Sequence, residues 1–175
     1  MTFEELEQGV RSEFPAYKRV KKADSWMMRC IDVFLKIITF GEMKAFLQTF
    51  VTTVGTTVYT PEAWDVWAPE NRMMILRHER VHMRQAKKYT RPLFTFLYLF
   101  FPLPGFLSYF RMKFEREAYE ESLRAAAEYF GIEAIDNPQT MDRYVRHFTT
   151  SEYFWMWPFR RSHERWYIQV VDLLR

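Results

Sequence analysis

The sequence predicts a mostly helical α+β fold that contains one small β-sheet or hairpin. Three observations predict it: apolar residues recur at helical spacing in several segments, Gly is scarce at 5 residues, and residues 45–59 are rich in Thr, Val and Phe. Scarce Gly argues against a turn-rich β-sandwich. The stretch 45–59, interrupted at Gly55, indicates two short strands or one bulged strand. The 175-residue length and the 49% hydrophobic content predict one globular domain over residues 1–175.

Helices account for most of the remaining chain. The apolar periodicity predicts a first helix at residues 3–14 and a second that begins at a cap, Asp24 or Ser25, and stops at Gly41. Five more helices are predicted at residues 69–89, 92–101, 105–130, 137–148 and 162–174. Pro69 suits the first position of the long third helix, and Gly131 suits the end of the fifth. The sequence predicts a basic linker at residues 18–22 and loops at 61–69 and 153–161.

The composition excludes several classes of protein. The single cysteine, Cys30, excludes an intrachain disulfide framework and a Cys-based zinc finger. Because Cys30 shares an apolar helix stripe with Trp26 and Phe34, we expect it in the core. The net charge of +3 is too small to indicate a nucleic-acid partner. The acidic N-terminus lacks the basic start and the apolar run of a signal peptide, which predicts a cytoplasmic protein.

Residues 93–110 form a nearly charge-free stretch at the lower length limit of a membrane span. Pro102, Pro104 and Gly105 interrupt it, which favours two short buried elements joined by a turn. A peripheral contact with a membrane or with a protein partner through this stretch stays open. The Trp- and Arg-rich residues 153–161 offer a second candidate partner surface, or else an aromatic cap over the core.

The helix expected over residues 69–89 contains His78-Glu79-Arg80-Val81-His82, an H-E-x-x-H motif. Two histidines four positions apart lie one turn apart on one helix face, so both imidazoles can reach one metal ion. Glu79 lies about 100° round the helix, where it can hold a metal-bound water without being a ligand. A helical wheel places the histidines on the inner face with Asn71, Met74, Ile75, Val81, Gln85 and Tyr89, opposite Arg77, Arg80, Arg84 and Lys87. Buried histidines need polar partners, and we favour a metal ion over other hydrogen-bonding groups.

A catalytic zinc ion needs a third protein ligand and an open fourth position. No third histidine follows the motif closely, and a later helix offers Glu115, Glu117, Glu120 and Glu121. The helical wheel places Glu115 nearest the centre of the inner face, whereas Glu117 and Glu120 point outward and Glu121 lies at the margin. Glu115 is therefore the expected third ligand, while a solvated charge run explains the other three.

The motif H-E-R-V-H, followed by E-R-E-A at residues 115–118, resembles the gluzincin-type zinc peptidases. This group includes stress-response membrane peptidases and small cytoplasmic or phage-encoded enzymes. The resemblance covers about residues 45–130. It implies a zincin-like helical core that follows a strand within residues 52–61, with helical extensions at both ends of the chain.

The resemblance also implies the roles of individual residues. His78, His82 and Glu115 match the ligands of one Zn²⁺ per chain, and Glu79 matches the general base of peptide-bond hydrolysis. Many relatives carry Asp four positions after the glutamate ligand, where this chain has Tyr119. Gluzincins often stabilise the oxyanion with a downstream His or Tyr, for which the candidates here are His147, His163 and Tyr153.

The leading hypothesis is a zinc-dependent metallopeptidase that hydrolyses peptides or proteins in the cytoplasm or in a phage virion. The alternative is a structural or interaction protein, such as a phage particle component, that retains the zinc site with little or no catalysis. A third hypothesis is a peripheral membrane protein that binds through residues 93–110.

Overall fold

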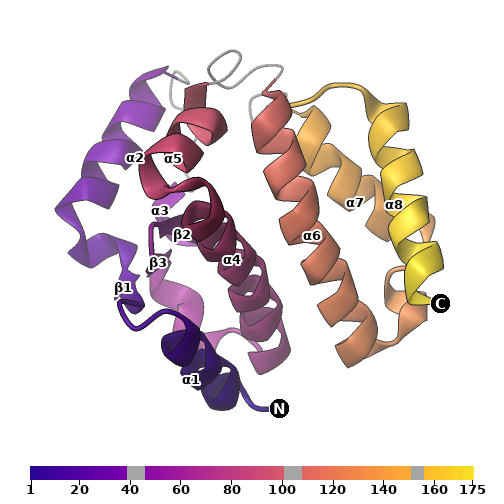
Figure 1. Ribbon diagram of the computed structural model, residues 1–175, viewed down its shortest axis with the longest axis horizontal. Coiled ribbons are helices and arrows are strands. Elements are labelled where there is room, and N and C mark those ends of the chain that lie inside the picture. Colours follow the sequence, from indigo (N-terminus) through magenta and orange to yellow (C-terminus); the bar gives the residue numbers. More distant parts are fainter. Residues whose placement is uncertain (39–45, 101–107, 151–155) are drawn as a thin grey trace. The chain divides into compact units, whose positions relative to one another are not determined.

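The computed structural model describes residues 1–38, 46–100, 108–150 and 156–175 (Figure 1). These residues are mostly helical with one small sheet, so the predicted fold class is confirmed. The chain divides into two compact units, Met1–Glu79 (unit 1) and Arg80–Arg175 (unit 2), with the boundary inside one continuous helix. The expectation of a single domain stays a prediction.

Unit 1 combines the sheet with several helices. Its elements are α1 (Phe3–Glu13), β1 (Lys18–Lys21), the 3-10 helix η1 (Lys22–Asp24), α2 (Trp26–Ile38), α3 (Phe46–Thr49), β2 (Thr52–Val54), β3 (Thr57–Thr60), η2 (Glu62–Val66) and the first half of α4 (Pro69–Tyr89). Thr2 and Glu5 form a capping box at the start of α1. Trp64 is almost fully buried and packs edge-on against Phe3 at 6.1 Å between ring centroids. This contact joins η2 to α1.

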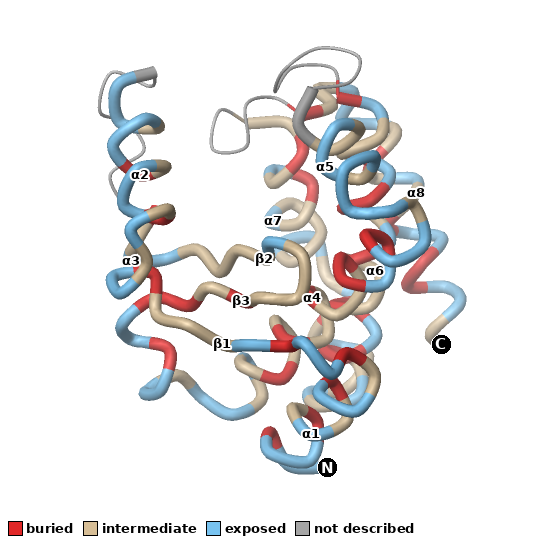
Figure 2. Tube along the Cα trace, turned by 60° about the vertical axis from the view of Figure 1, so that its left-hand side comes forward, coloured by how far each residue is buried: buried red, intermediate tan, exposed pale blue. Residues whose placement is uncertain are grey.

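The sheet has the strand order β1-β3-β2, with β3 in the centre (Figure 2). β2 and β3 are antiparallel and joined at Gly55, whose φ of 65° is accessible to Gly at no steric cost. β1 pairs with β3 in parallel, with Lys18 opposite Thr57. The basic linker predicted at residues 18–22 is therefore wrong over most of its length. Lys- and Arg-rich segments are common as edge strands, because charged side chains discourage further pairing.

Unit 2 is helical throughout its described residues. It continues α4 and adds α5 (Arg91–Phe100), α6 (Tyr109–Phe130), η3 (Ile132–Ala134), α7 (Pro138–Thr149) and α8 (Arg160–Leu174). α6, α7 and α8 lie side by side (Figure 1). The side chain of Asn137 caps α7 ahead of Pro138, and Gly131, with φ of 84°, ends α6. Phe148, Met112 and Met156 form a buried cluster between these helices.

The expectation that Cys30 lies in the core is wrong, because Cys30 is exposed. Trp26 and Phe34, which share its stripe, are 72% and 60% exposed, while Met28 and Asp32 form the buried side of α2. Periodicity identifies the apolar face of a helix but not the direction in which it points. Asp32 tolerates burial because the Lys36 ammonium lies 2.6 Å from its Oδ2 atom.

Among the described residues, no helix combines the length and the apolar composition needed to cross a bilayer. Within the stretch 93–110 the structure describes the end of α5 and the first residues of the long helix α6. Leu93 and Phe96 are about half-exposed, so the expectation of two short buried elements is wrong. Several predicted features, namely Gly41, the turn at Pro102–Gly105, and Tyr153 with Trp155, lie outside the described residues.

Candidate metal centre

The buried face of α4 determines how its motif is presented. Met73, Leu76 and Met83 are buried on this helix, as is Glu79. Asn71 is exposed and His78 is half-buried. The buried face is thus centred nearer to Glu79 than the helical wheel predicted. His82 is buried on this face, whereas His78 lies at its margin.

His78, His82 and Glu115 offer one ligand atom each, and these three atoms lie within 4.8 Å of one another. Oε1 of Glu115 is 3.6 Å from Nε2 of His82, and both side chains are almost fully buried. Tetrahedral zinc ligands at about 2.1 Å from the metal lie about 3.4 Å apart. The spacing of this pair therefore suits one zinc ion without rearrangement of α6.

Gln85 orients the ring of His82 from one turn further along α4. Its amide nitrogen donates to the carbonyl of Phe114 at 3.0 Å and to Oε2 of Glu117 at 2.9 Å. Its amide oxygen must then accept from Nδ1 of His82, 2.9 Å away. With the proton on Nδ1, the lone pair of Nε2 faces the Glu115 carboxylate. The ring is thus held in the tautomer that a metal ligand requires.

Tyr98 of α5 supports Glu115. Its hydroxyl donates a short hydrogen bond to Oε1 of Glu115, and its ring meets that of His82 edge-on at 5.8 Å. Burial raises the pKa of Tyr98 well above its ordinary value, and the Glu115 charge raises the pKa further. The phenol therefore stays protonated and remains a donor. Sequence reasoning missed Tyr98, whose only signal was a polar group in a mostly apolar segment.

Tyr119 occupies the position where many gluzincins carry a supporting Asp. Here its ring stacks on His147 at 5.2 Å between centroids and meets Tyr144 and Phe148 edge-on. Tyr119 thus packs α6 against α7, while a different helix supplies the hydrogen bond to Glu115.

Glu79 is only 7% exposed, and its electrostatic partner in unit 1 is Lys22. Lys22 is fully buried, and its ammonium donates to the carbonyl of Phe46 at 2.9 Å. Burial lowers the pKa of Lys22 to about 7, while the charges of Glu79 and Asp32 act in the opposite direction. Sequence analysis had assigned Lys22 to a linker, because a buried lysine has no periodic signature.

The remaining predicted site residues lie elsewhere. His163 is fully buried, with Nε2 donating to the carbonyl of Trp157 at 2.8 Å and Nδ1 accepting from Arg116 at 3.1 Å. Burial lowers its pKa to about 4. His147 packs against Tyr119, so neither histidine belongs to the candidate metal group. The oxyanion role assigned to His147, His163 or Tyr153 stays a prediction.

The other glutamates of α6 are at its surface. Glu117 is exposed and accepts from Gln85. Glu120 and Glu121 form ion pairs with Arg124 at 3.6 and 3.3 Å, as expected of neighbours on a solvated helix face.

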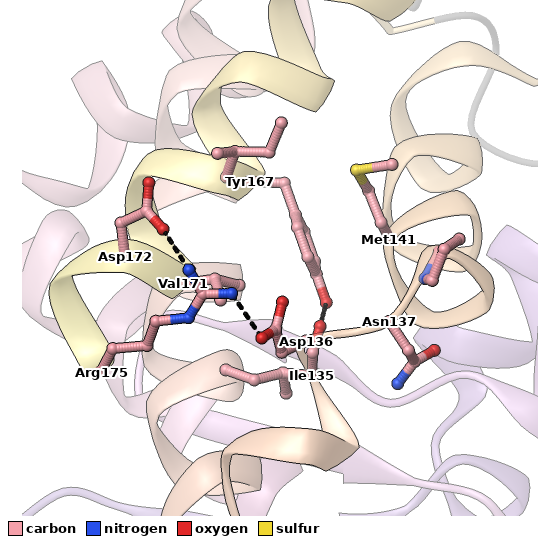
Figure 3. A pocket seen from close by; sticks show the side chains of 10 residues that line it. Ile135, Asp136, Asn137, Met141, Tyr167, Val171, Asp172 and Arg175 are labelled. Atoms are coloured by element: carbon pink, nitrogen blue, oxygen red, sulfur yellow. Dashed lines mark hydrogen bonds and ion pairs between the residues drawn. The ribbon is translucent and has the colours of Figure 1, made fainter.

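Two cavities are relevant to binding. One, of about 350 Å³, is lined by Trp67, Asn71, Met74 and Ile75, and so lies along α4 on the side of His78. The other, of about 290 Å³, lies between η3, α7 and α8 (Figure 3). At its edge Arg175 pairs with both Asp136 and Asp172. These charges satisfy one another, and no residue of the candidate metal group lines this second cavity.

Comparison with protein-family models, curated proteins and solved structures returns no match for this chain.

Proposed function

We propose that this chain is a zinc-dependent hydrolase of peptide bonds, in which His78, His82 and Glu115 hold one Zn²⁺ and Glu79 is the general base. The observation that carries the proposal is the distance of 3.6 Å between Oε1 of Glu115 and Nε2 of His82, whose ring is held in the tautomer that a metal ligand requires. His78 lies one helical turn from His82 and completes the group. Two histidines and a glutamate are a donor set of catalytic zinc sites.

The residues around the ligands would divide the work of hydrolysis. A bound zinc ion lowers the pKa of its water and polarises the scissile carbonyl. Glu79 takes the proton from the attacking water as the new C–O bond forms, and returns it to the amine nitrogen as the C–N bond breaks. Gln85 and Tyr98 hold His82 and Glu115 in place, so that little reorganisation is needed. The cavity beside Met74 and Ile75 offers an apolar surface for a substrate side chain.

Metal analysis tests the ligand set directly. The purified protein should contain about one zinc per chain, and a His78→Ala, His82→Ala double variant should contain none. His147→Gln is the matched control, because it removes a histidine outside the group. Full zinc content in the double variant would contradict the proposal.

Hydrolysis is tested with a mixture of fluorogenic peptides, with and without a zinc chelator. Cleavage that requires zinc and is lost in Glu79→Gln supports the peptidase. Bound zinc with no cleavage of peptides or denatured proteins would favour the alternative, a structural or interaction protein that keeps the metal for stability. The burial of Glu79 beside the Lys22 charge is the observation that favours this alternative.

A further inference from the structure

α2 presents an apolar face to the outside of unit 1. Trp26, Val33, Phe34 and Ile37 are 72%, 56%, 60% and 67% exposed, and Cys30 between them is also exposed. Their spacing places them on one broad face, which we call the α2 face. Figure 2 shows this helix as largely exposed. Single exposed apolar residues are ordinary, but a contiguous patch of several hundred Å² indicates a binding surface.

The core of unit 1 uses the opposite side of the same helix. Met28 is fully buried there, and Asp32 is 4% exposed with its carboxylate held by Lys36. The core of unit 1 therefore contacts only a narrow side of α2. The larger and more hydrophobic side of the helix, the α2 face, is exposed. If α2 were rotated so that the α2 face was buried, Met28 would become exposed. The Asp32–Lys36 pair would turn with the helix and leave its present surroundings.

The charges on α2 indicate which kind of partner can bind the α2 face. Asp32 is the only acidic residue in its sequence and is buried, whereas Arg29 is exposed. A second copy of the chain on this face would bring its own Arg29, and α2 exposes no acidic residue to pair with it. The α2 face therefore suits a partner whose outer layer is negatively charged and whose interior, just below that layer, is apolar.

α5 in unit 2 has the same character. Leu93 and Phe96 are 48% and 51% exposed, Arg91 begins the helix, and its sequence contains no acidic residue. Each unit thus carries one short helix whose exposed side is apolar and accompanied only by positive charge.

We propose that α2 binds in the plane of an anionic membrane, with the α2 face at the boundary between headgroups and acyl chains. Thirteen residues give a helix about 20 Å long, suited to lie in the interface. Trp26 lies at one end, and Trp is favoured at this depth because its ring is amphipathic. The proposal is independent of peptide hydrolysis.

Vesicle flotation tests the proposal with the full chain. The protein should float with phosphatidylcholine vesicles that contain about a third phosphatidylglycerol, and less with phosphatidylcholine alone. The Trp26→Ser, Phe34→Ser double variant should bind at least tenfold more weakly. Val66→Ser is the matched control, since Val66 is an 84% exposed apolar residue of the same unit. Arg29→Glu should weaken binding to the anionic vesicles only.

Cys30 supplies a second readout that does not depend on a destabilising change. It is the only cysteine of the chain, so an environment-sensitive thiol dye attached to it reports on the α2 face. Anionic vesicles should shift its emission to the blue. The same dye on Val66→Cys in a Cys30→Ser background should not respond.

Four results would overturn the proposal. Three are failure of the wild-type protein to float with anionic vesicles, unchanged flotation of the double variant, and a dye at Cys30 that stays in water. The fourth is a dimer in solution that the double variant abolishes, which would show that a second copy covers the α2 face.

Discussion

Replacing Lys22 with Met should stabilise the protein, and the gain should be largest below pH 7. Lys22 is fully buried, and burial lowers its pKa to about 7 from the ordinary 10.5. The folded protein therefore holds an ammonium ion where the surroundings disfavour it. Met has a similar length and no charge, so it can fill the same space.

The magnitude follows from the difference between the two pKa values. At about 1.4 kcal/mol per pH unit, burial of the charged form costs on the order of 5 kcal/mol below pH 7. Met also loses the hydrogen bond to the Phe46 carbonyl and the contact of the ammonium with the Phe46 ring at 3.5 Å, which together are worth about 2 kcal/mol. The expected net gain is about 3 kcal/mol at pH 6.

The sign of the pH dependence is also determined. Between pH 7 and 10.5 the unfolded chain keeps the Lys22 proton while the folded protein loses it. The free energy of unfolding of the wild-type protein should therefore rise with pH through this window, and the advantage of Met should shrink.

Urea denaturation of the wild-type protein and of Lys22→Met at five pH values from 6 to 10 measures both effects. Lys18→Met is the matched control, because Lys18 is exposed on β1. If the two proteins show the same pH dependence, or if Lys22→Met is the less stable at pH 6, the account of a buried charged lysine is refuted. A gain in stability with a loss of hydrolysis would indicate that the charge serves Glu79.

Three further predictions concern the candidate site and the core. Glu79→Gln should keep its zinc while hydrolysis falls by about a hundredfold or more, as measured by metal analysis and initial rates; loss of the metal would mean that Glu79 is a ligand. Tyr98→Phe should weaken zinc binding by about ten- to a hundredfold in a chelator competition, because Glu115 loses its hydrogen bond, and unchanged affinity would argue against this support. The pKa of His163 is lowered to about 4 from 6.5, so between these pH values only the unfolded chain binds the proton. The protein should therefore lose on the order of 3 kcal/mol of stability as the pH falls from 6.5 to 4. His163→Gln should lack this part of the loss, and identical acid denaturation profiles of the two proteins would contradict the assignment.

The elements with strong local signals could be predicted from the sequence. The long helix that begins at Pro69 has a first-position proline, and α6 ends at a glycine with positive φ. The spacing of His78 and His82 likewise determines that both lie on one side of α4, whatever the fold.

Features that depend on distant parts of the chain could not be predicted. The sequence did not predict β1, because its basic residues form ion pairs with residues far along the chain. Arg19 pairs with Asp65 at 3.2 Å, and Lys21 pairs with Glu62 at 2.8 Å. Tyr98 reaches Glu115 only through the packing of α5 on α6. The direction of the apolar stripe on α2 depended on whether Asp32 could be buried, which required Lys36 as its partner.

The parallel pairing of β1 with β3 has a consequence for the order of folding. The β2–β3 hairpin needs only the turn at Gly55, and hairpins of this kind form within microseconds. β1 can join β3 only after α2, α3 and β2 have been gathered into a closed loop, which carries a larger entropic penalty. We therefore expect β1 to add to the hairpin late. A φ-value near zero for Val20→Ala in folding kinetics would be its signature, and a value near one would show that β1 belongs to the folding nucleus.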